Sequence, residues 1–448
     1  MKRKPPELPA VAHQPKRYTG ISAAEALELR RRYLTPGLIT YYQQPLMIVE
    51  GHRQYVYDEQ GRRYLDGFAG IATVSVGHCH PKIVEVASRQ LATLQHSTTI
   101  YLHPTVGEYG QRLAAKLPGE LNVCYFVNSG SEANDLAMLM SRLYTGSYDM
   151  LALRNGYHGG VASAMALTAN SKWKFGVAHS FGVHHALCPD VYRGAWRADE
   201  PHAAAKYAND LQDLIDTATS GRVAGFIAES IQGVGGVVVY PDGYLARAFE
   251  IVRAAGGLAI SDEVQTGFGR TGENFWGFMA QGVVPDIVTM AKGIGNGAPL
   301  AAVVTRREIA ETLARRIHFN TYAGNPVSSA IGKTVIEIIE EERLQENAHD
   351  VGGYLLARLR ELKEEHTLIG DVRGRGLMIG VELVRDRQTR EPANTEAAQV
   401  LERARTLGLL LGKGGLAGNV IRIKPPLCIT RADADFLVAA FGCALARD

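Results

Sequence analysis

A lysine at the junction of an apolar run and a glycine-rich stretch has the position that covalent chemistry needs. Lys292 follows the apolar residues 285–291 (PDIVTMA) and precedes the stretch GIGNG at 293–297. We expect the apolar run to be a buried strand that delivers the lysine against backbone, partly out of water. Burial lowers the pKa of an ammonium group, and its amine can then form a Schiff base with an aldehyde. Taken alone, Lys292 would more often be a solvated surface charge.

An acidic residue ends a second apolar run, thirty residues upstream. Asp262 follows residues 257–261 (GLAIS). A carboxylate at a buried strand end is costly unless it pairs with a cation, and a protonated pyridine nitrogen is such a cation. Together with Lys292, this predicts pyridoxal 5′-phosphate (PLP), whose ring would then act as an electron sink. Gln265 can reach the phenolic oxygen of that ring if the chain turns there. The alternative is an aspartate that caps a turn before a glycine loop.

A phosphate site is predicted where a strand passes through small residues into a helix. The segment NSGSEAND at 128–135 lies between a predicted strand at 122–127 and a helix-like stretch at 136–143. Free backbone amides and the positive end of the helix dipole converge there, so Gly130 and Ser131 can hold a phosphate. An ordinary helix N-cap is the alternative.

An aromatic for the flat face of the cofactor occurs in the motif RNGYHGG at 154–160, which contains Tyr157 and His158. Alone, Tyr157 would more often belong to the core.

Several motifs in one order resemble the class III aminotransferases, the omega-aminotransferase group of fold-type I PLP enzymes. The motifs are NSGSEAN, YHG, AESIQG, SDEVQTGFGRTG, DIVTMAKG and FNTYAGNP. Within that class the chain is most similar to the alanine-glyoxylate aminotransferase 2 group, through segments such as LDGFAGIATVSVGHCHP and GDVRGRGLMIGVE. The resemblance covers nearly the whole chain. It implies an α/β fold, with a mostly parallel sheet in a large domain and a smaller α+β domain.

The resemblance also implies a role for each matching position. Lys292 is similar to the Schiff-base lysine, which also moves a proton between the substrate's α-carbon and the cofactor. Thr321, in FNTYAGNP, matches a residue that reaches the phosphate of the neighbouring subunit's cofactor, so we expect a homodimer or a tetramer built from dimers. A threonine in an ordinary loop is the alternative. The other expected cofactor-binding residues are Asp262 at the pyridinium, Gln265 at the phenolate oxygen, Tyr157 on the ring face, Gly130 and Ser131 at the phosphate, and His158 and Glu229 nearby.

The resemblance places Arg422, in NVIRIKPP, at the arginine that grips the substrate carboxylate by a two-pronged ion pair. Some relatives that act on ornithine or 4-aminobutyrate neutralise this arginine with a gating glutamate, five residues after the position of Glu229. Here that position is Val234. An ungated Arg422 favours small α-amino and α-keto acids such as alanine, pyruvate and glyoxylate.

Three further residues are expected near the substrate. Lys413 lies close to where amine transaminases of this class carry a mobile arginine, and a solvated lysine in a glycine turn is an equal alternative. Tyr41 and Tyr42 fall in a segment that lines the substrate mouth in relatives. Two adjacent tyrosines in an extended chain cannot both point the same way.

Three activities remain open on the same scaffold: amino transfer between an amino acid and a keto acid in two half-reactions, an omega-amine transaminase that takes arylalkylamines, and a phospho-lyase. A dinucleotide-binding dehydrogenase is suggested by residues 293–297, but the third glycine and the acidic ribose ligand of that fingerprint are missing.

The composition is that of an ordinary globular enzyme. The 448 residues carry a net charge of +2, which argues against a nucleic-acid partner, and no apolar stretch reaches the roughly twenty residues of a membrane helix. Five scattered cysteines suit a reducing compartment. No second cluster completes a metal site around the histidines of GHCHP, so we expect no metal. Mammalian relatives are mitochondrial, but residues 1–7 (MKRKPPE) lack a secretory core or a long Arg/Ser-rich presequence, so we expect a cytoplasmic enzyme.

The order of elements predicts three segments. Apolar runs at 122–127, 149–154, 223–228, 257–261, 286–291 and 301–305 alternate with helix-like stretches, which is typical of a parallel sheet covered on both faces. Long amphipathic helices follow at 330–346 and 351–366, then a strand at 377–383 and a helix at 396–407. We therefore expect a large PLP-binding domain at 76–330 and a small C-terminal domain at 331–448, with residues 1–75 contributing to the small domain through strands at 54–57 and 63–65.

Overall fold

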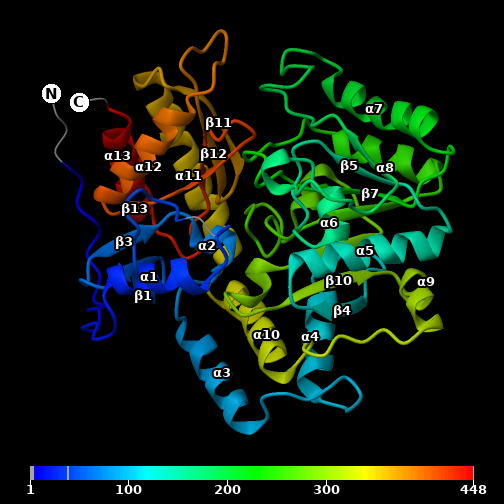
Figure 1. Cartoon of the computed structure of the whole chain (residues 1–448), viewed down its shortest axis with the longest axis horizontal. Coiled ribbons are helices and arrows are strands. Elements are labelled where there is room, and N and C mark those ends of the chain that lie inside the picture. Colours follow the sequence, from blue (N-terminus) through cyan, green and yellow to red (C-terminus); the bar gives the residue numbers. More distant parts are fainter. Residues whose placement is uncertain (1–4, 38–39, 447–448) are drawn as a thin grey trace.

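Three sheets organise the chain in the computed structural model, which describes residues 5–37 and 40–446 (Figure 1). The largest has seven strands in the order β4-β10-β9-β8-β7-β5-β6. Its strands β9, β8, β7, β5 and β6 are mutually parallel, and β10 is antiparallel to both of its neighbours. The predicted α/β fold with a mostly parallel sheet is confirmed. The strands are β4 (Val123–Val127), β5 (Met150–Leu153), β6 (Val183–Ala186), β7 (Gly225–Glu229), β8 (Leu258–Asp262), β9 (Ile287–Met290) and β10 (Ala301–Thr305).

Each of the six predicted apolar runs overlaps one of these strands, and the seventh strand, β6, was missed. β6 has the sequence VHHA, lies at the edge of the sheet, and is only partly buried at three of its four residues. An edge strand needs no continuous apolar run, because one of its sides has no neighbouring strand.

Helices cover both faces of this sheet, because successive apolar side chains along its strands point to opposite faces. In β10, Ala301 and Val303 pack in a cluster with α5 (Gly130–Thr145), whereas Ala302 and Val304 pack with α10 (Pro326–Glu341) and α4 (Pro104–Ala114). Successive strand residues point to opposite faces, so each face needs its own cover. The remaining helices against this sheet are α6 (Ala162–Leu167), α7 (Ala203–Ala218) and α8 (Tyr244–Ala254).

Two smaller sheets combine the two ends of the chain. One has the order β1-β2-β3-β13, in which β13 from the C-terminal part pairs in parallel with β3. The other has the order β11-β12-β15-β14. Both lie beside α11, α12 and α13, away from the helices α7 and α8 (Figure 1). The strands are β1 (Ile48–His52), β2 (Tyr55–Asp58), β3 (Arg63–Asp66), β11 (Ile369–Arg375), β12 (Met378–Leu383), β13 (Leu409–Leu410), β14 (Gly412–Gly414) and β15 (Val420–Ile423).

The two long predicted helices are present with shifted bounds, as α10 and α11 (Leu344–Glu365), and the break between them falls at Arg343, which has a left-handed φ of 52°. The helix expected at 396–407 is α12 (Asn394–Thr406). Strand β11 was missed because its sequence, IGDVRGR, has neither an apolar run nor strict alternation. The other helices are α1 (Ala23–Tyr33), α2 (Ala69–Ala72), α3 (Pro81–Thr93), α9 (Arg307–Ala310) and α13 (Arg431–Leu445). None of the helices in the described ranges is long and apolar enough to cross a bilayer.

Candidate active site

The register of the large sheet sets polar side chains in a row. Glu229 at the end of β7 pairs with Asp262 at the end of β8, and Asp262 pairs with Thr289 in β9. Residues paired in this way across neighbouring strands share one face, at the carboxyl ends where parallel sheets place ligands. All three residues are buried.

A pocket of about 140 Å³ opens at these strand ends and gathers most of the predicted cofactor residues. The predicted residues that line it are Gly130, Ser131, Tyr157, His158, Glu229, Asp262, Gln265 and Lys292. The prediction had assigned no role to three further lining residues, Asn134, Gly159 and Val264.

Lys292 enters the pocket from a backbone that is itself unusual. Its φ of 52° lies in the left-handed region, which is rare for a residue with a side chain and is found most often at functional sites. Among the described residues, no hydrogen bond or ion pair engages its amine. Burial lowers the pKa of Lys292, against the opposing charges of Asp262 and Glu229. A free amine of lowered basicity is what a carbonyl-attacking lysine requires.

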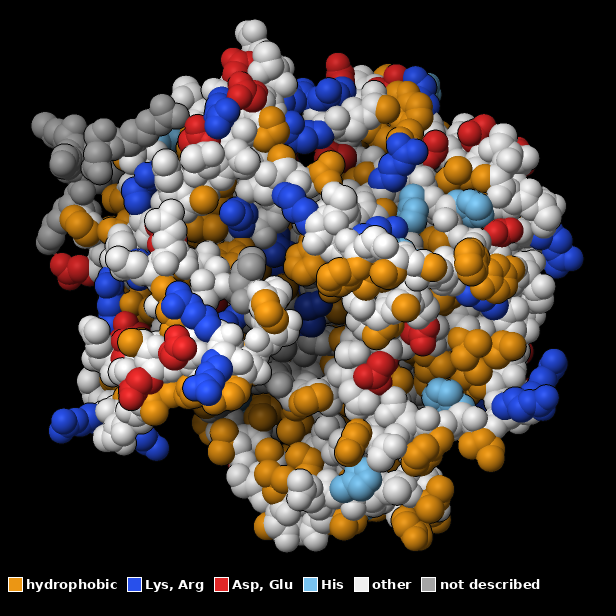
Figure 2. Space-filling view, viewed as in Figure 1, with side chains coloured by type: hydrophobic (Ala, Val, Ile, Leu, Met, Phe, Trp, Pro, Cys, Tyr) orange, Lys and Arg blue, Asp and Glu red, His pale blue; other side chains and the backbone are white. Residues whose placement is uncertain are grey.

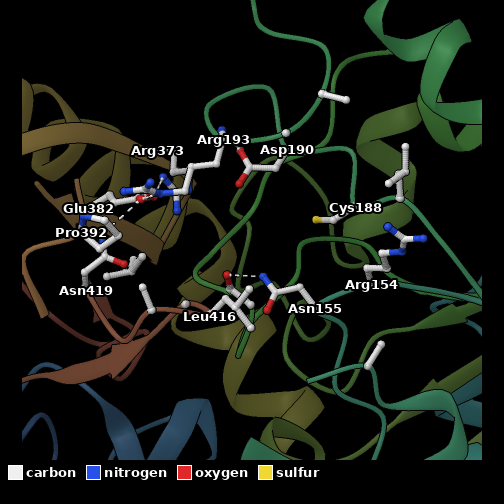
Figure 3. Close-up of a pocket in the computed structure, with 18 of the residues that line it drawn as sticks. Arg154, Asn155, Cys188, Asp190, Arg193, Arg373, Glu382, Pro392, Leu416 and Asn419 are labelled. Atoms are coloured by element: carbon white, nitrogen blue, oxygen red, sulfur yellow. Dashed lines mark hydrogen bonds and ion pairs between the residues drawn. The ribbon is translucent and has the colours of Figure 1, made fainter. Parts of the chain in front are cut away.

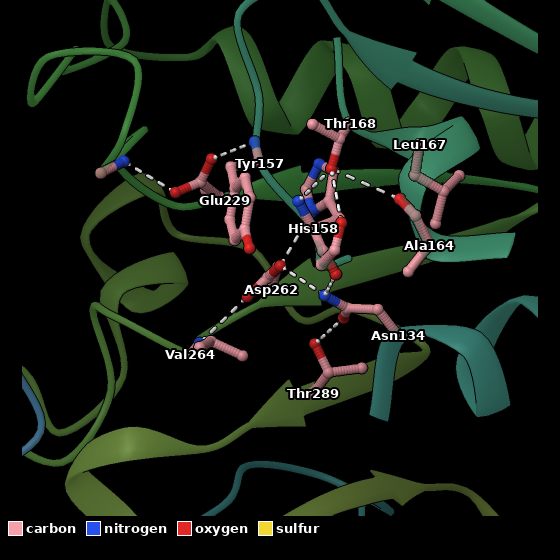
Figure 4. Close-up of polar contacts among 12 residues, drawn as sticks. Asn134, Tyr157, His158, Ala164, Leu167, Thr168, Glu229, Asp262, Val264 and Thr289 are labelled. Carbon is pink, nitrogen blue, oxygen red and sulfur yellow. Dashed lines mark hydrogen bonds and ion pairs between the residues drawn. The ribbon is translucent and has the colours of Figure 1, made fainter. Parts of the chain in front are cut away.

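Asp262 is held by three donors (Figure 4). Its Oδ2 lies 2.8 Å from His158 Nδ1 and accepts a 2.8 Å hydrogen bond from Asn134 Nδ2, while its Oδ1 accepts from the backbone N–H of Val264 at 3.0 Å. Burial alone would lower the pKa of His158, but the hydrogen bond and charge of Asp262 outweigh burial and raise it. The arrangement keeps a carboxylate at the strand end without an arginine or lysine as its partner.

Asn134 connects this carboxylate to the strand next to it. Its Oδ1 accepts a 2.6 Å hydrogen bond from Thr289 Oγ1, and its Nδ2 also donates to the carbonyl of His158 at 2.8 Å. Asn134 is the last letter of the motif NSGSEAN and falls one helical turn after Gly130, on the face of α5 toward the sheet. That spacing was the signal that could have identified it.

The start of α5 forms the other end of the pocket. Ser129 caps the helix by accepting from the backbone N–H of Glu132, and the first-turn amides of Gly130 and Ser131 have no carbonyl within the helix to bond. Gly159 passes so close that a Cβ on it would lie 2.5 Å from Ser131 Oγ. Together with a free amine and a buried carboxylate, these open amides fit the aldehyde, the ring nitrogen and the phosphate of PLP.

Glu229 turns its carboxylate to the backbone. It accepts from the N–H of Tyr157 at 3.1 Å and from that of Gly233 at 2.7 Å, and burial raises its pKa. These bonds fix the segment that carries Tyr157, whose ring meets Trp173 edge-on with 5.1 Å between centroids.

Gln265 binds a residue that we did not predict. Its Oε1 accepts a 2.6 Å hydrogen bond from the amine of Lys424, a lysine with 0% exposure. Lys424 lies two residues after Arg422 and directly follows the end of β15, so continuing the strand's period of two by one residue places both side chains on one face. The alternation of Val420, Arg422 and Lys424 was the available signal.

Arg422 lies next to the pocket lining and is buried. It donates from Nε to the carbonyl of Lys413 at 3.0 Å and from Nη1 to the carbonyl of Gly233 at 3.4 Å, and it sits over the ring of Phe68. No carboxylate in the described part of the chain pairs with it. Burial lowers its pKa. Gly414 leaves room for it, since a Cβ there would lie 2.8 Å from Arg422 Nε.

The other predicted substrate residues occupy different positions. Tyr41 donates to the carbonyl of Lys413 at 3.3 Å and also accepts from its N–H, so Lys413 takes part through its backbone. The ring of Tyr42 points elsewhere and lies under the guanidinium of Arg405, 5.7 Å away. Thr321 is exposed and does not line the pocket.

A larger cavity of about 600 Å³ contains none of the predicted site residues (Figure 3). It lies beside the ion pairs that Glu382 makes with Arg193 and Arg373. In the predicted non-metal motif GHCHP, His78 and His80 contact different carboxylates, those of Asp66 and Glu342. Within residues 5–37 and 40–446, no group of three or more His, Cys, Asp and Glu side chains is arranged to hold a metal ion.

Comparison with protein families gives a match to the aminotransferase class-III model over residues 40–445. The alanine–glyoxylate aminotransferase 2 homolog 2, mitochondrial, of Arabidopsis thaliana is 55% identical over 440 residues, which cover 98% of this chain and 91% of the relative. The alanine–glyoxylate aminotransferase 2, mitochondrial, of Homo sapiens is 46% identical over 462 residues, which cover 99% and 90%.

Solved structures with the same fold include enzymes of two kinds. An (S)-enantioselective omega-transaminase from Thermomicrobium roseum superposes with a TM-score of 0.88 at 37% identity, covering 95% of this chain and 99% of its own. A phospholyase from Arthrobacter in complex with phosphoethanolamine gives a TM-score of 0.88 at 35% identity, covering 94% and 99%.

The expectation of a cytoplasmic enzyme is wrong, because the names of the Arabidopsis and human relatives place both in mitochondria. The inference failed for a physical reason. The composition of the first residues does not separate the cytoplasm from other compartments.

Proposed function

Since the chain belongs to the class III aminotransferase family, we propose that it moves the amino group of a small α-amino acid such as alanine to a small keto acid, glyoxylate or pyruvate. The chain is a PLP-dependent aminotransferase. When bound, PLP supplies an aldehyde that takes up the donor's amino group, and the keto acid receives it in a second half-reaction. The observation that carries the choice of substrate is Arg422, a buried guanidinium that no described carboxylate neutralises.

In this proposal each residue of the pocket has one task at the cofactor. Lys292 is the covalent attachment point, and its Nζ moves the proton that leaves the substrate's α-carbon. Asp262, held by His158 and Asn134, keeps the ring nitrogen protonated. Gln265 donates to the phenolic oxygen. The other tasks are those of Tyr157 on the ring face, Gly130 and Ser131 at the phosphate, and Glu229 in fixing the segment that carries Tyr157.

The donor and acceptor are held by their carboxylates. Arg422 uses two of its N–H groups on backbone carbonyls and also contacts the side chain of Tyr41, and its remaining N–H groups bind the substrate carboxylate. Val234 stands at the gate position, so this arginine is free in both half-reactions. Tyr41 and the backbone of Lys413 shape the same side of the substrate site, and Tyr42 supports it from outside.

The active unit in this proposal is a homodimer, or a tetramer built from dimers, in which Thr321 reaches the phosphate of the partner's cofactor. Exposed apolar side chains surround Thr321, and the rings of His96 and Tyr322 lie 5.9 Å apart, which joins two segments into one surface. Figure 2 shows hydrophobic side chains gathered over the region of α3 and α4. The exposed large apolar residues of the two segments that His96 and Tyr322 join are Ile100, Tyr101, Leu102, Ile317, Phe319 and Tyr322. Such a large exposed patch is typical of a subunit interface.

We also propose the division into residues 1–75, 76–330 and 331–448. The pairing of β3 with β13, which joins the first segment to the last, supports it.

The test is a single half-reaction. Purified holoenzyme is mixed with excess L-alanine and no keto acid, and the yellow absorbance of the bound cofactor is followed while pyruvate is assayed. We expect the yellow absorbance to disappear with one pyruvate formed per active site. Persistent yellow absorbance without pyruvate would refute the proposal, and parallel samples with 1-phenylethylamine or phosphoethanolamine would then show whether the enzyme is an amine transaminase or a phospho-lyase.

The variant Arg422→Ala serves as the matched control. It should lose the reaction with L-alanine and keep any reaction with 1-phenylethylamine, which has no carboxylate. Equal losses with both donors would mean that Arg422 does not act on the carboxylate.

A further inference from the structure

A second buried lysine lies behind the pocket and has no acid to pair with. Lys424 has 0% exposure, and among the described residues its amine makes no ion pair with any carboxylate. Its hydrogen bond to Gln265 Oε1, at 2.6 Å, is the one that its side chain makes within the described chain. Burial, together with the charges of Arg422, Lys292 and Arg270, lowers its pKa well below the ordinary value, opposed only by the charge of Glu229. A buried amine in such surroundings costs stability, so its retention calls for a function.

The contact determines which way the Gln265 amide faces. The oxygen and nitrogen of a glutamine amide are interchangeable in shape, but a protonated lysine amine has donors and no acceptor. In the structure the amine donates to the amide oxygen, and a protonated amine has no lone pair with which to accept from the NH₂ end. The NH₂ group is left at the other end, and Gln265 lines the pocket together with Lys292.

Gly233 supports the same amide from a second side. A Cβ on Gly233 would lie 2.3 Å from Gln265 Nε2 and 2.4 Å from Oε1. The φ of Gly233 is not positive, so the glycine is required here by space and not by backbone conformation. The Gln265 amide therefore packs between the backbone at Gly233 and the Lys424 amine.

We infer that Lys424 is a positioning residue that holds the Gln265 amide with its NH₂ group toward the phenolic oxygen of the cofactor. This inference rests on the proposed contact between Gln265 and that oxygen. Without Lys424, the amide can turn its oxygen toward the phenolic oxygen, and two acceptors would then face each other. The lysine thus acts on the cofactor through Gln265 and has no contact of its own with the substrate.

The experiment uses Lys424→Met, which removes the donor and keeps the length and apolar stem of the side chain. It is combined with Gln265→Ala in a double-mutant cycle. Two quantities are measured in every variant: the dissociation constant for PLP and the pH midpoint of the change in the cofactor's visible absorbance. Gly233→Ala is an independent variant that displaces the same amide without touching Lys424.

In the Lys424→Met variant we expect PLP to bind about 5- to 30-fold more weakly, the effect of losing one well-directed hydrogen bond to a charged group. The pH midpoint should move up by about 0.5–1 unit, because the phenolic oxygen loses a donor that stabilises its negative charge. Gly233→Ala should move both quantities in the same direction. In the Gln265→Ala background, Lys424→Met should change neither.

The melting temperature of the apo-protein separates this role from a structural one. Lys424→Met should melt no lower than the parent, because it removes a buried amine that has no acid partner. The inference is overturned if Lys424→Met leaves both cofactor quantities unchanged while Gln265→Ala alters them, or if its effect persists in full without Gln265. If Gln265→Ala itself changes nothing, the proposed contact of Gln265 with the cofactor fails as well, and the L-alanine half-reaction still tests the substrate proposal.

Discussion

Asn134 offers a direct test of how the fold holds the carboxylate of Asp262. Asn134→Ala removes two donated hydrogen bonds, to Asp262 Oδ2 and to the carbonyl of His158, and leaves the hydroxyl of Thr289 without its acceptor. The bond to the carboxylate contributes about 1.5–3 kcal/mol and each neutral bond about 1 kcal/mol. Allowing for partial rearrangement, we expect the free energy of unfolding of the domain that contains the large sheet to fall by about 3 kcal/mol.

Thr289→Val is the matched control. It breaks the same chain of hydrogen bonds one step further from Asp262, with almost no change in volume. It should cost about 1–2 kcal/mol, because Asn134 Oδ1 loses one neutral partner and its bond to Asp262 remains. Both residues are buried, so the two variants differ chiefly in whether they touch the carboxylate.

The assay compares thermal midpoints of the apo-proteins and dissociation constants for PLP. A weakened hold on the Asp262 carboxylate should make PLP bind at least about tenfold more weakly in Asn134→Ala, against less than about threefold in Thr289→Val. Equal PLP affinities in the two variants would refute the reasoning, since the bond from Asn134 to Asp262 would then contribute nothing to the cofactor site.

Four further outcomes are expected. Lys292→Ala should abolish amino transfer from L-alanine with an unchanged far-UV circular dichroism spectrum, and retained turnover would defeat its role as the attachment point. Arg422→Ala should raise KM for L-alanine by at least about 30-fold through the loss of a charge-assisted pair of bonds, with PLP affinity unaltered. Thr321→Val should weaken PLP binding about tenfold in the assembled protein, and an effect that is equally large in isolated monomers would count against a contact across an interface. Burial lowers the pKa of Lys292 in the folded apo-protein below its ordinary value of 10.5. Between these two pKa values the unfolded chain binds one more proton than the folded chain. The contribution of Lys292 to the free energy of unfolding therefore rises with pH across that window. The advantage in melting temperature of apo Lys292→Met over the parent should therefore shrink from pH 7 toward pH 10, and a constant difference would contradict the lowered pKa.

The predicted residues that the structure brings together in one pocket are those with a local signal. Lys292, Asp262 and Gly130 each stand where an apolar run ends, and a strand end followed by small residues is visible in the sequence itself. Because the strands are parallel and adjacent, their carboxyl ends meet at one edge of the sheet, so separate local signals converge in space.

The partners of those residues were missed because they come from distant segments. Asn134 and Asp262 are 128 residues apart, and Gln265 and Lys424 are 159 residues apart. The helical spacing of Asn134 and the alternation around Lys424 indicate which face each side chain takes, but the residue that it meets there depends on strand order and register. Tyr41 and Tyr42 do point in different directions, but they lie in a bend and not in an extended strand, so their contacts with Lys413 and Arg405 were needed to tell them apart.

The pocket and its surroundings hold three buried basic groups that form no ion pair with a carboxylate of the described chain. Arg422, Lys424 and Arg270 are all buried, and burial lowers the pKa of each, that of Arg270 to about 10. Arg270 also keeps Nη2 buried without a hydrogen-bond partner in the described chain. Each such group destabilises the empty protein. A cofactor with a phosphate and a phenolate, followed by a substrate with a carboxylate, brings the missing negative charge. Binding of the cofactor and substrate therefore offsets the destabilisation that these buried groups cause. Because both ligands bind only the folded state, their binding raises the free energy of unfolding.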